Sequence, residues 1–209
     1  MRTVELGRRV DLLSMDPHFF EISIAIYRSD DSTFATYVLN SYSQRKGTAD
    51  RLVFLADTMR SLGDMLMTEE NPLSLRFSCG HAHQLALKRL FVEACKIMPG
   101  SDFNLQPLWV LDKKNDLTIH ADSLGKGRYL CRGDRDGTRE ERRVAAMAAG
   151  LGKLAELDVD GNEISFPCGF DHHKIVALLL TRALNVRNAL REQEASATRG
   201  VLNAPSQQR

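Results

Sequence analysis

One short segment, Phe-x-Cys-Gly-x-x-His, occurs twice in this chain, at 77–83 and again at 166–172. When the sequence is compared with itself at this 89-residue offset without a gap, nine of the 45 positions from 50 to 94 are identical. Average residue usage gives roughly three identities at an arbitrary offset. Because two of the four cysteines and two of the six histidines match in one run, we interpret the chain as an internal duplication.

Local patterns predict the same order of elements in both copies. Aromatic and β-branched runs predict strands, and apolar residues at helical spacing predict helices. In the first copy the predicted strands are 19–27, 34–41 and 73–78, and the helices are 50–67 and 82–98. In the second copy the predicted strands are 108–111, 117–121 and 163–166, with 128–131 as a candidate further strand, and the helices are 138–157 and 171–192.

We therefore predict an α/β (α+β) fold made of two tandem β-β-α-β-α units, 15–100 and 101–192. A unit whose sheet is covered on one face buries the other by packing on a neighbour. We expect the two units to form a pseudo-twofold pair, with their sheets joined edge to edge or face to face. The Ser-, Ala-, Gln- and Arg-rich residues 193–209 are expected to be a flexible C-terminal tail.

The repeated segments carry the candidate site. In each copy the cysteine is expected at the end of a strand, the glycine in a tight turn, and the histidine four residues later in the first turn of a helix. Two thiolates and two imidazoles are a ligand set that tetrahedral zinc accepts. The predicted metal ligands are Cys79, His83, Cys168 and His172.

This hypothesis makes the protein a metal-binding protein with zinc or another divalent transition metal between its two halves. The ion would polarise a small polar substrate or activate water if the protein is an enzyme. The sequence itself identifies no catalytic residue. Other polar side chains could serve as additional ligands or could hydrogen-bond to the ligands. These are His81, Asp171, His173 and His120.

Two other interpretations use the same turns. In the first, the Cys-Gly turns are packing features of a non-catalytic structural or oligomerising protein. In the second, the Cys79-Gly80 and Cys168-Gly169 pairs resemble the layout of cofactor-independent racemases and epimerases such as diaminopimelate epimerase. That resemblance implies paired cysteines acting as acid and base on opposite faces of a substrate carbon. It is limited to these residues, because His81-Ala82 and Phe170-Asp171 replace the glycine-rich continuation of that family.

The composition of the chain limits the kinds of partner that we expect it to bind. The formal net charge of +1 provides no overall attraction to nucleic acid or acidic membranes, so we expect neither as a partner. No nucleotide-binding glycine motif is present. The first residues lack the apolar core of a signal peptide, and we expect a soluble, cytoplasmic protein with reduced cysteines. The helix predicted from 171 is apolar over most of its circumference, which places it either in the core or in a homodimer contact.

Overall fold

The computed structural model describes residues 9–13, 22–28, 34–41, 43–68, 71–100 and 107–202. Within these residues the chain forms four helices and two antiparallel sheets of five strands each. The fold is therefore mixed α+β, as the sequence predicts at this coarse level. Residues 15–21 and 101–106 of the predicted units and 203–209 of the predicted tail lie outside the described residues.

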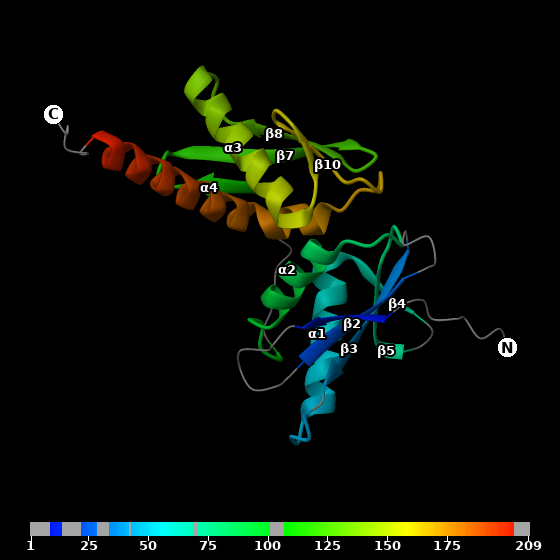
Figure 1. Ribbon diagram of the computed structural model, residues 1–209. Helices are drawn as coiled ribbons and strands as arrows, with labels where there is room; N and C mark the ends of the chain where they lie inside the picture. Colours follow the sequence, from blue (N-terminus) through cyan, green and yellow to red (C-terminus); the bar gives the residue numbers. More distant parts are fainter. Residues whose placement is uncertain are drawn as a thin grey trace.

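The first sheet has the strand order β1-β2-β3-β5-β4 (Figure 1). Its strands are β1 (Arg9–Leu13), β2 (Ile22–Arg28), β3 (Ala35–Ser41), β4 (Met65–Thr68) and β5 (Asn71–Phe77). Two helices belong to this half, α1 (Thr48–Gly63) between β3 and β4, and α2 (Gln84–Ala94) after β5.

The second sheet has the corresponding order, β6-β7-β8-β10-β9. Its strands are β6 (Trp109–Asp112), β7 (Leu117–Gly125), β8 (Arg128–Gly133), β9 (Asp158–Asp160) and β10 (Glu163–Ser165). The helices of this half are α3 (Thr138–Ala155) and α4 (His173–Leu202).

The predicted order β-β-α-β-α is wrong, because each half contains three strands before its first helix and a two-stranded hairpin after it. Strand β1 precedes the predicted start of the first unit at residue 15, and α4 continues ten residues beyond its predicted end at 192. The first predicted helix was also too long. It stops at Asp64, which adopts a left-handed conformation with φ 50° and donates its N–H to the carbonyl of Arg60. The chain then turns directly into β4.

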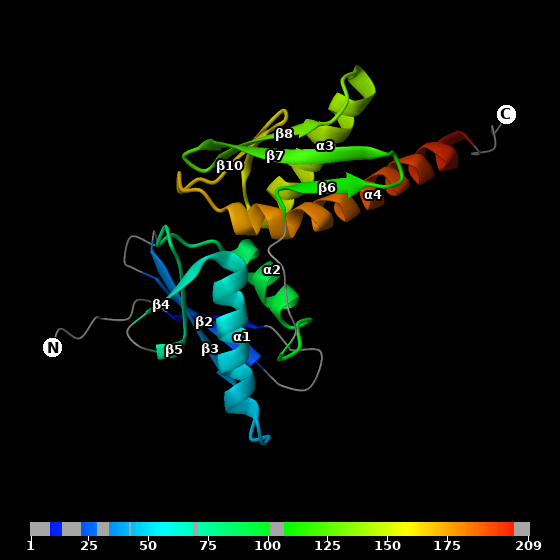
Figure 2. The same ribbon diagram turned by 180° about the vertical axis from the view of Figure 1, so that it is seen from behind.

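The two halves meet through their helices (Figures 1 and 2). Helix α1 contacts α4, and α2 contacts both α3 and α4. The expected joining of the sheets is wrong for both arrangements. The described strands of each sheet pair only within that sheet, which rules out joined edges, and the main contacts between the halves are made by helices and not by sheet faces. Helices bring wide apolar surfaces that would otherwise be exposed, so packing helix on helix buries more area than joining two short sheet edges.

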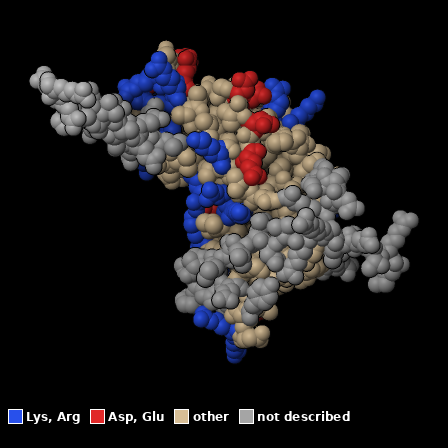
Figure 3. Space-filling model, in the orientation of Figure 1, with Lys and Arg blue, Asp and Glu red and all other residues tan. Residues whose placement is uncertain are grey.

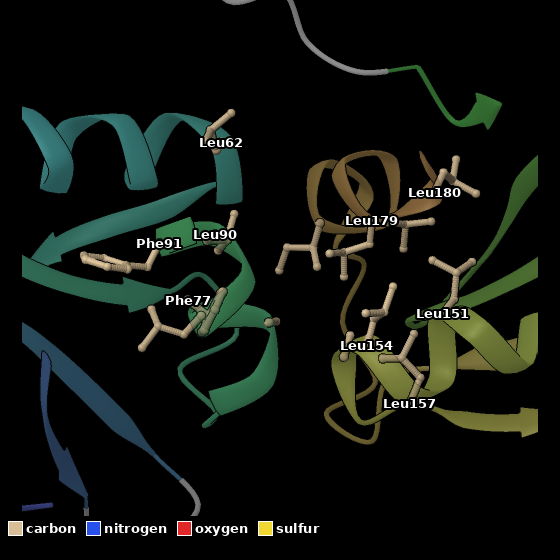
Figure 4. Close-up of a cluster of buried hydrophobic side chains, with 14 of the residues drawn as sticks. Leu62, Phe77, Leu90, Phe91, Leu151, Leu154, Leu157, Leu179 and Leu180 are labelled. Atoms are coloured by element: carbon tan, nitrogen blue, oxygen red, sulfur yellow. The ribbon is translucent and has the colours of Figure 1, made fainter. Parts of the chain in front are cut away.

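One continuous hydrophobic core spans both halves. Figure 4 shows side chains of this cluster from the two halves, including Leu62 and Leu90 from the first and Leu151 and Leu179 from the second. Helix α4 is apolar around most of its circumference because it packs in this core; its buried residues include Ile175, Val176, Leu179, Leu180, Ala183 and Leu184. The homodimer contact stays a prediction.

None of the helices in the described part of the chain is long and apolar enough to cross a membrane. On the face of the molecule shown in Figure 3, Lys and Arg gather in several separate groups, with Asp and Glu between them on the half formed by the second sheet and its helices. This mixed distribution agrees with the near-zero net charge.

Candidate metal centre

Each Cys-Gly-x-x-His segment is a turn between a strand and a helix. In the first half, β5 ends at Phe77 and α2 begins directly after His83, and Gly80 has φ 77°. The Sγ of Cys79 lies 3.2 Å from Nε2 of His83. The expected places of the two side chains are wrong by one or two residues, because Cys79 lies in the turn after the strand and His83 immediately precedes the helix.

The second half repeats this geometry. Strand β10 ends at Ser165 and α4 begins at His173, and Gly169 has φ 70°. The Sγ of Cys168 lies 3.3 Å from Nε2 of His172. A left-handed backbone of this kind suits glycine, which has no Cβ to clash with the following carbonyl.

The tertiary structure brings the two turns together. One ligand atom from each of Cys79, His83, Cys168 and His172 lies within 4.8 Å of the other three. The planes of the His83 and His172 rings are inclined at 75° to each other, with centroids 4.8 Å apart. Cys79, His83 and His172 are buried and Cys168 is half-buried. A cluster of this composition and compactness could hold one metal ion.

Backbone N–H groups point at both sulfurs. The N–H of His81 donates to Sγ of Cys79 at 3.3 Å, and the N–H of Phe170 donates to Sγ of Cys168 at 3.5 Å. In both turns the donor is two residues after the cysteine, and the left-handed glycine between them orients it. Hydrogen bonds to the charged form of a group favour that form, so these turns stabilise thiolates, the form in which cysteine binds metals.

Two tyrosines hold the histidines in place. The backbone N–H of His83 donates to the Tyr37 hydroxyl at 3.0 Å, and the backbone N–H of His172 donates to the Tyr129 hydroxyl at 2.7 Å. Both tyrosine side chains are fully buried, on β3 and β8 respectively. Each satisfies an N–H that helix geometry leaves without a partner at a helix start.

The ungapped self-comparison did not find these tyrosines, because they are 92 positions apart and the turns are 89 apart. Strand pairing identifies them as equivalents, since Tyr37 pairs with Leu75 and Tyr129 pairs with Ile164. A self-comparison that allowed a three-residue gap between the tyrosine-bearing strand and the turn would have aligned Tyr37 with Tyr129, two of the four tyrosines in the chain.

Aromatic rings enclose the histidines. Phe77 packs edge-on against His83, with centroids 5.1 Å apart, and also approaches His172 at 6.0 Å. Phe166 lies 4.6 Å from His172 and 5.8 Å from His83. Each phenylalanine therefore contacts histidines from both halves, and this apolar wall limits the positions that the imidazoles can adopt.

The two thiols influence each other's protonation. A hydrogen bond with Cys168 and then burial raise the pKa of Cys79. The hydrogen bond from Cys79 lowers the pKa of Cys168, and bonds with His172, His83 and the backbone of Phe170 add to this effect against the opposing effect of burial. Without an ion the first proton leaves Cys168, and Cys79 keeps its proton and donates it to the Cys168 thiolate. Burial likewise raises the pKa of Tyr129, which keeps its hydroxyl neutral.

The other predicted polar residues lie around the cluster or away from it. Nδ1 of His81 is 3.0 Å from the carbonyl of Cys79, and Nδ1 of His173 is 3.1 Å from the Tyr129 hydroxyl. Asp171 accepts the N–H of Gly127 at 2.8 Å, which ties the second turn to the β7–β8 loop. His120 lies on β7 opposite Trp109 and outside the four-residue cluster.

Comparison of this chain with protein-family models, curated proteins and solved structures finds no match. Any functional conclusion therefore comes from the cluster formed by the two turns.

Proposed function

We propose that this protein binds one divalent transition-metal ion, with zinc as the expected metal, and that the ion links the two halves. The observation that carries the proposal is the convergence of Cys79, His83, Cys168 and His172, whose ligand atoms all lie within 4.8 Å of one another. Buried polar groups need partners, and a metal ion satisfies four of them at once.

The distances suit a tetrahedral site. Zinc lies about 2.3 Å from sulfur and about 2.0 Å from nitrogen, which places sulfur and nitrogen about 3.5 Å apart at tetrahedral angles. The sulfur–nitrogen distances within the two turns, 3.2 and 3.3 Å, need only a slight expansion to reach this value. Thiolate and imidazole ligands favour zinc over magnesium, calcium or manganese, which prefer oxygen.

Four protein ligands complete a tetrahedral shell, which favours a structural role over a catalytic one. Action on a small polar substrate would require one ligand to leave. The epimerase-like alternative is supported less well, because a substrate carbon between two sulfurs needs a contact of about 3.5–4.0 Å to each of them. The sulfurs of Cys79 and Cys168 are less than 4.8 Å apart.

We also propose that the two halves arose by tandem duplication and are related by a pseudo-twofold axis through the metal site. Their sheets share one strand order. The buried positions of α1 recur in α3 at a spacing of 92 residues, for example Leu52 with Val144, Met59 with Leu151 and Leu62 with Leu154. Glu93 and Arg182, which are 89 positions apart, form an ion pair across the α2–α4 contact, as expected of equivalent positions near such an axis.

The direct test is elemental analysis of tag-free protein purified without added metal. We expect about one zinc ion per chain, lost in Cys168→Ser. Cys131→Ser serves as the matched control, because Cys131 is buried in β8 and outside the cluster, and this variant should keep its ion. Protein that holds no ion, and takes up none from a zinc solution, would overturn the proposal in favour of turns that serve packing alone.

Cobalt substitution tests the ligand set independently. Tetrahedral Co(II) bound by two thiolates and two imidazoles should give strong visible absorption bands together with sulfur-to-cobalt charge-transfer bands. His172→Ala should weaken or shift the visible bands, and Cys131→Ser should leave them unchanged. A spectrum of octahedral cobalt would contradict the proposed shell.

A further inference from the structure

The two cysteines of the cluster differ in access to solvent. Cys79 is 6 % exposed, and Cys168 is half-buried. The residue two positions after Cys168 is Phe170, which is 52 % exposed, so the second turn lies at the surface of the protein. The other two described cysteines, Cys95 and Cys131, are both buried. A dissolved reagent therefore meets the sulfur of Cys168 first.

We propose that Cys168 is a site of oxidation by hydroperoxides, that Cys79 resolves it to a disulfide, and that the reaction releases the metal ion. This inference rests on the proposed metal site and adds its regulation. The geometry that carries it is the placement of one accessible and one buried sulfur less than 4.8 Å apart, on turns from different halves. The backbone N–H groups of Phe170 and His81 orient the two sulfurs within these turns.

The first step oxidises Cys168. Its thiolate attacks one oxygen of the hydroperoxide, a sulfur–oxygen bond forms and the oxygen–oxygen bond breaks. Cysteine sulfur loses two electrons and becomes a sulfenic acid, and the leaving oxygen takes a proton from solvent to give water or, from an organic hydroperoxide, an alcohol. The sulfenic sulfur is a poor ligand, so the ion loses one of its four donors.

The second step joins the halves covalently. The Cys79 thiolate attacks the sulfenic sulfur, the sulfur–sulfur bond forms, and hydroxide leaves and takes a proton from solvent to become water. The sulfurs close from less than 4.8 Å to about 2.0 Å as the ion departs. Overall, two thiolates, one hydroperoxide and two protons give one disulfide, one water and one further water or alcohol. The ion, now without both thiolates, leaves as a dication.

The experiment treats metal-loaded protein with hydrogen peroxide and follows ion release with a chromophoric chelator. We expect one ion released for each disulfide formed, with the Cys79–Cys168 disulfide identified by peptide mass spectrometry after alkylation of free thiols. A thiol reductant with added zinc should restore the metal-loaded protein. Retention of the ion in excess peroxide, or disulfides that contain Cys95 or Cys131, would overturn the proposal.

Two variants separate the roles of the sulfurs. In Cys79→Ser the sulfenic acid on Cys168 has no resolving thiol, and dimedone should trap it there. In Cys168→Ser, Cys79 should react with peroxide as slowly as buried Cys95. If either variant fails to fold, Cys95→Ser and wild-type protein still test the proposal, because both should form the same disulfide at the same rate.

The outcomes also distinguish this proposal from the metal site itself. Metal content is measured before peroxide is added. Its absence would overturn the metal site and with it the release of an ion, and formation of the disulfide is then tested by itself. The reaction is repeated on metal-free protein, where the disulfide should form faster because no ion occupies the Cys168 sulfur. Protein that binds the ion but forms no Cys79–Cys168 disulfide in either state would overturn the oxidation proposal and leave the metal site intact.

Discussion

The two halves of the molecule agree closely inside the candidate site and differ at its edge. Both turns place a cysteine sulfur just over 3 Å from a histidine nitrogen, and both have a left-handed glycine. Around these, the first turn has His81 and Gln84 where the second has Phe170 and His173. The contacts that position the candidate ligands are therefore the same in both halves. The neighbouring residues differ between the two turns without changing the geometry of the cluster.

A second difference lies far from the cluster, in the core of the second half. Asp112 on β6 and Arg187 on α4 form an ion pair in which each side chain is 1 % exposed. The position 89 residues before Arg187 is Met98, which is 64 % exposed. The second half therefore contains a buried charge pair that the first half does not reproduce at this position.

The largest expected effect comes from removing the proposed ion, for which each half provides two ligands. An ion present at about a thousand times its dissociation constant stabilises the native state by about 4 kcal/mol. We expect a chelator to lower the free energy of unfolding, measured by urea denaturation, by about 4 kcal/mol or more. Cys79→Ser and Cys168→Ser should each lose the ion, because each half provides half of the shell. If only one of them did so, the halves would not contribute equally.

The next largest effect should come from Asp112→Asn, which leaves the Arg187 guanidinium buried without its counter-charge. Breaking a buried pair in this way costs about 3–5 kcal/mol. Urea denaturation at neutral pH measures it. Asp122→Asn is the control, since its pair with Arg132 is about half exposed and should contribute roughly 0.5 kcal/mol or less. Equal costs for the two variants would contradict the importance of the buried pair.

The same pair predicts a pH dependence. Burial opposes ionisation of Asp112, but hydrogen bonds from Arg187 and then Asn115 outweigh it and lower the pKa of the carboxyl below its ordinary value. Because the folded pKa is lower than the unfolded one, the stabilisation is fully present above the unfolded pKa, about 3.9, and is lost as the pH falls through the folded pKa. Denaturation curves at a series of acidic pH values should show this loss in wild-type protein, and a smaller one in Asp112→Asn.

Replacing the tyrosines compares equivalent positions of the halves directly. Tyr37→Phe and Tyr129→Phe each leave a buried histidine N–H without its acceptor, which costs about 1–3 kcal/mol. Tyr129→Phe also removes the contact with His173. Unfolding free energies of the two variants test these costs, and wild-type stability in either variant would contradict the role of its tyrosine.

The smallest effects should come from the turn glycines. An alanine in the left-handed conformation costs about 1–2 kcal/mol, and this applies to both Gly80→Ala and Gly169→Ala. A Cβ at Gly80 would also lie 2.8 Å from the ring of Phe34, while nothing lies within 4 Å of one at Gly169. Gly80→Ala should therefore cost slightly more.

A double-mutant cycle checks the cause of that difference. Adding Phe34→Ala to Gly80→Ala removes the crowded ring and should bring the cost of the glycine substitution down to that of Gly169→Ala. If Gly80→Ala still cost more than Gly169→Ala in the absence of the Phe34 ring, the difference in cost would have another origin in the turn.

Sequence patterns located most of the strands and all four helices, but missed β1, β4 and β9. Strand β9 has only three residues, all exposed, and its conformation depends on pairing with β10. Strand β4 begins directly after α1, and its first residues, Met65 and Leu66, continue the apolar pattern of the helix. Local propensity cannot place such a boundary, since the competing strand is stabilised by partners elsewhere in the chain.

By itself, the sequence identified the four residues of the candidate metal cluster, their pairing within each turn and the glycine between them, because these depend on neighbours a few positions apart. Only the tertiary structure decided that the two turns meet, that helices lie between the sheets, and that Tyr37 and Tyr129 hold the histidines. Those contacts join residues tens of positions apart, and their geometry follows from how the apolar faces of the helices pack in one shared core.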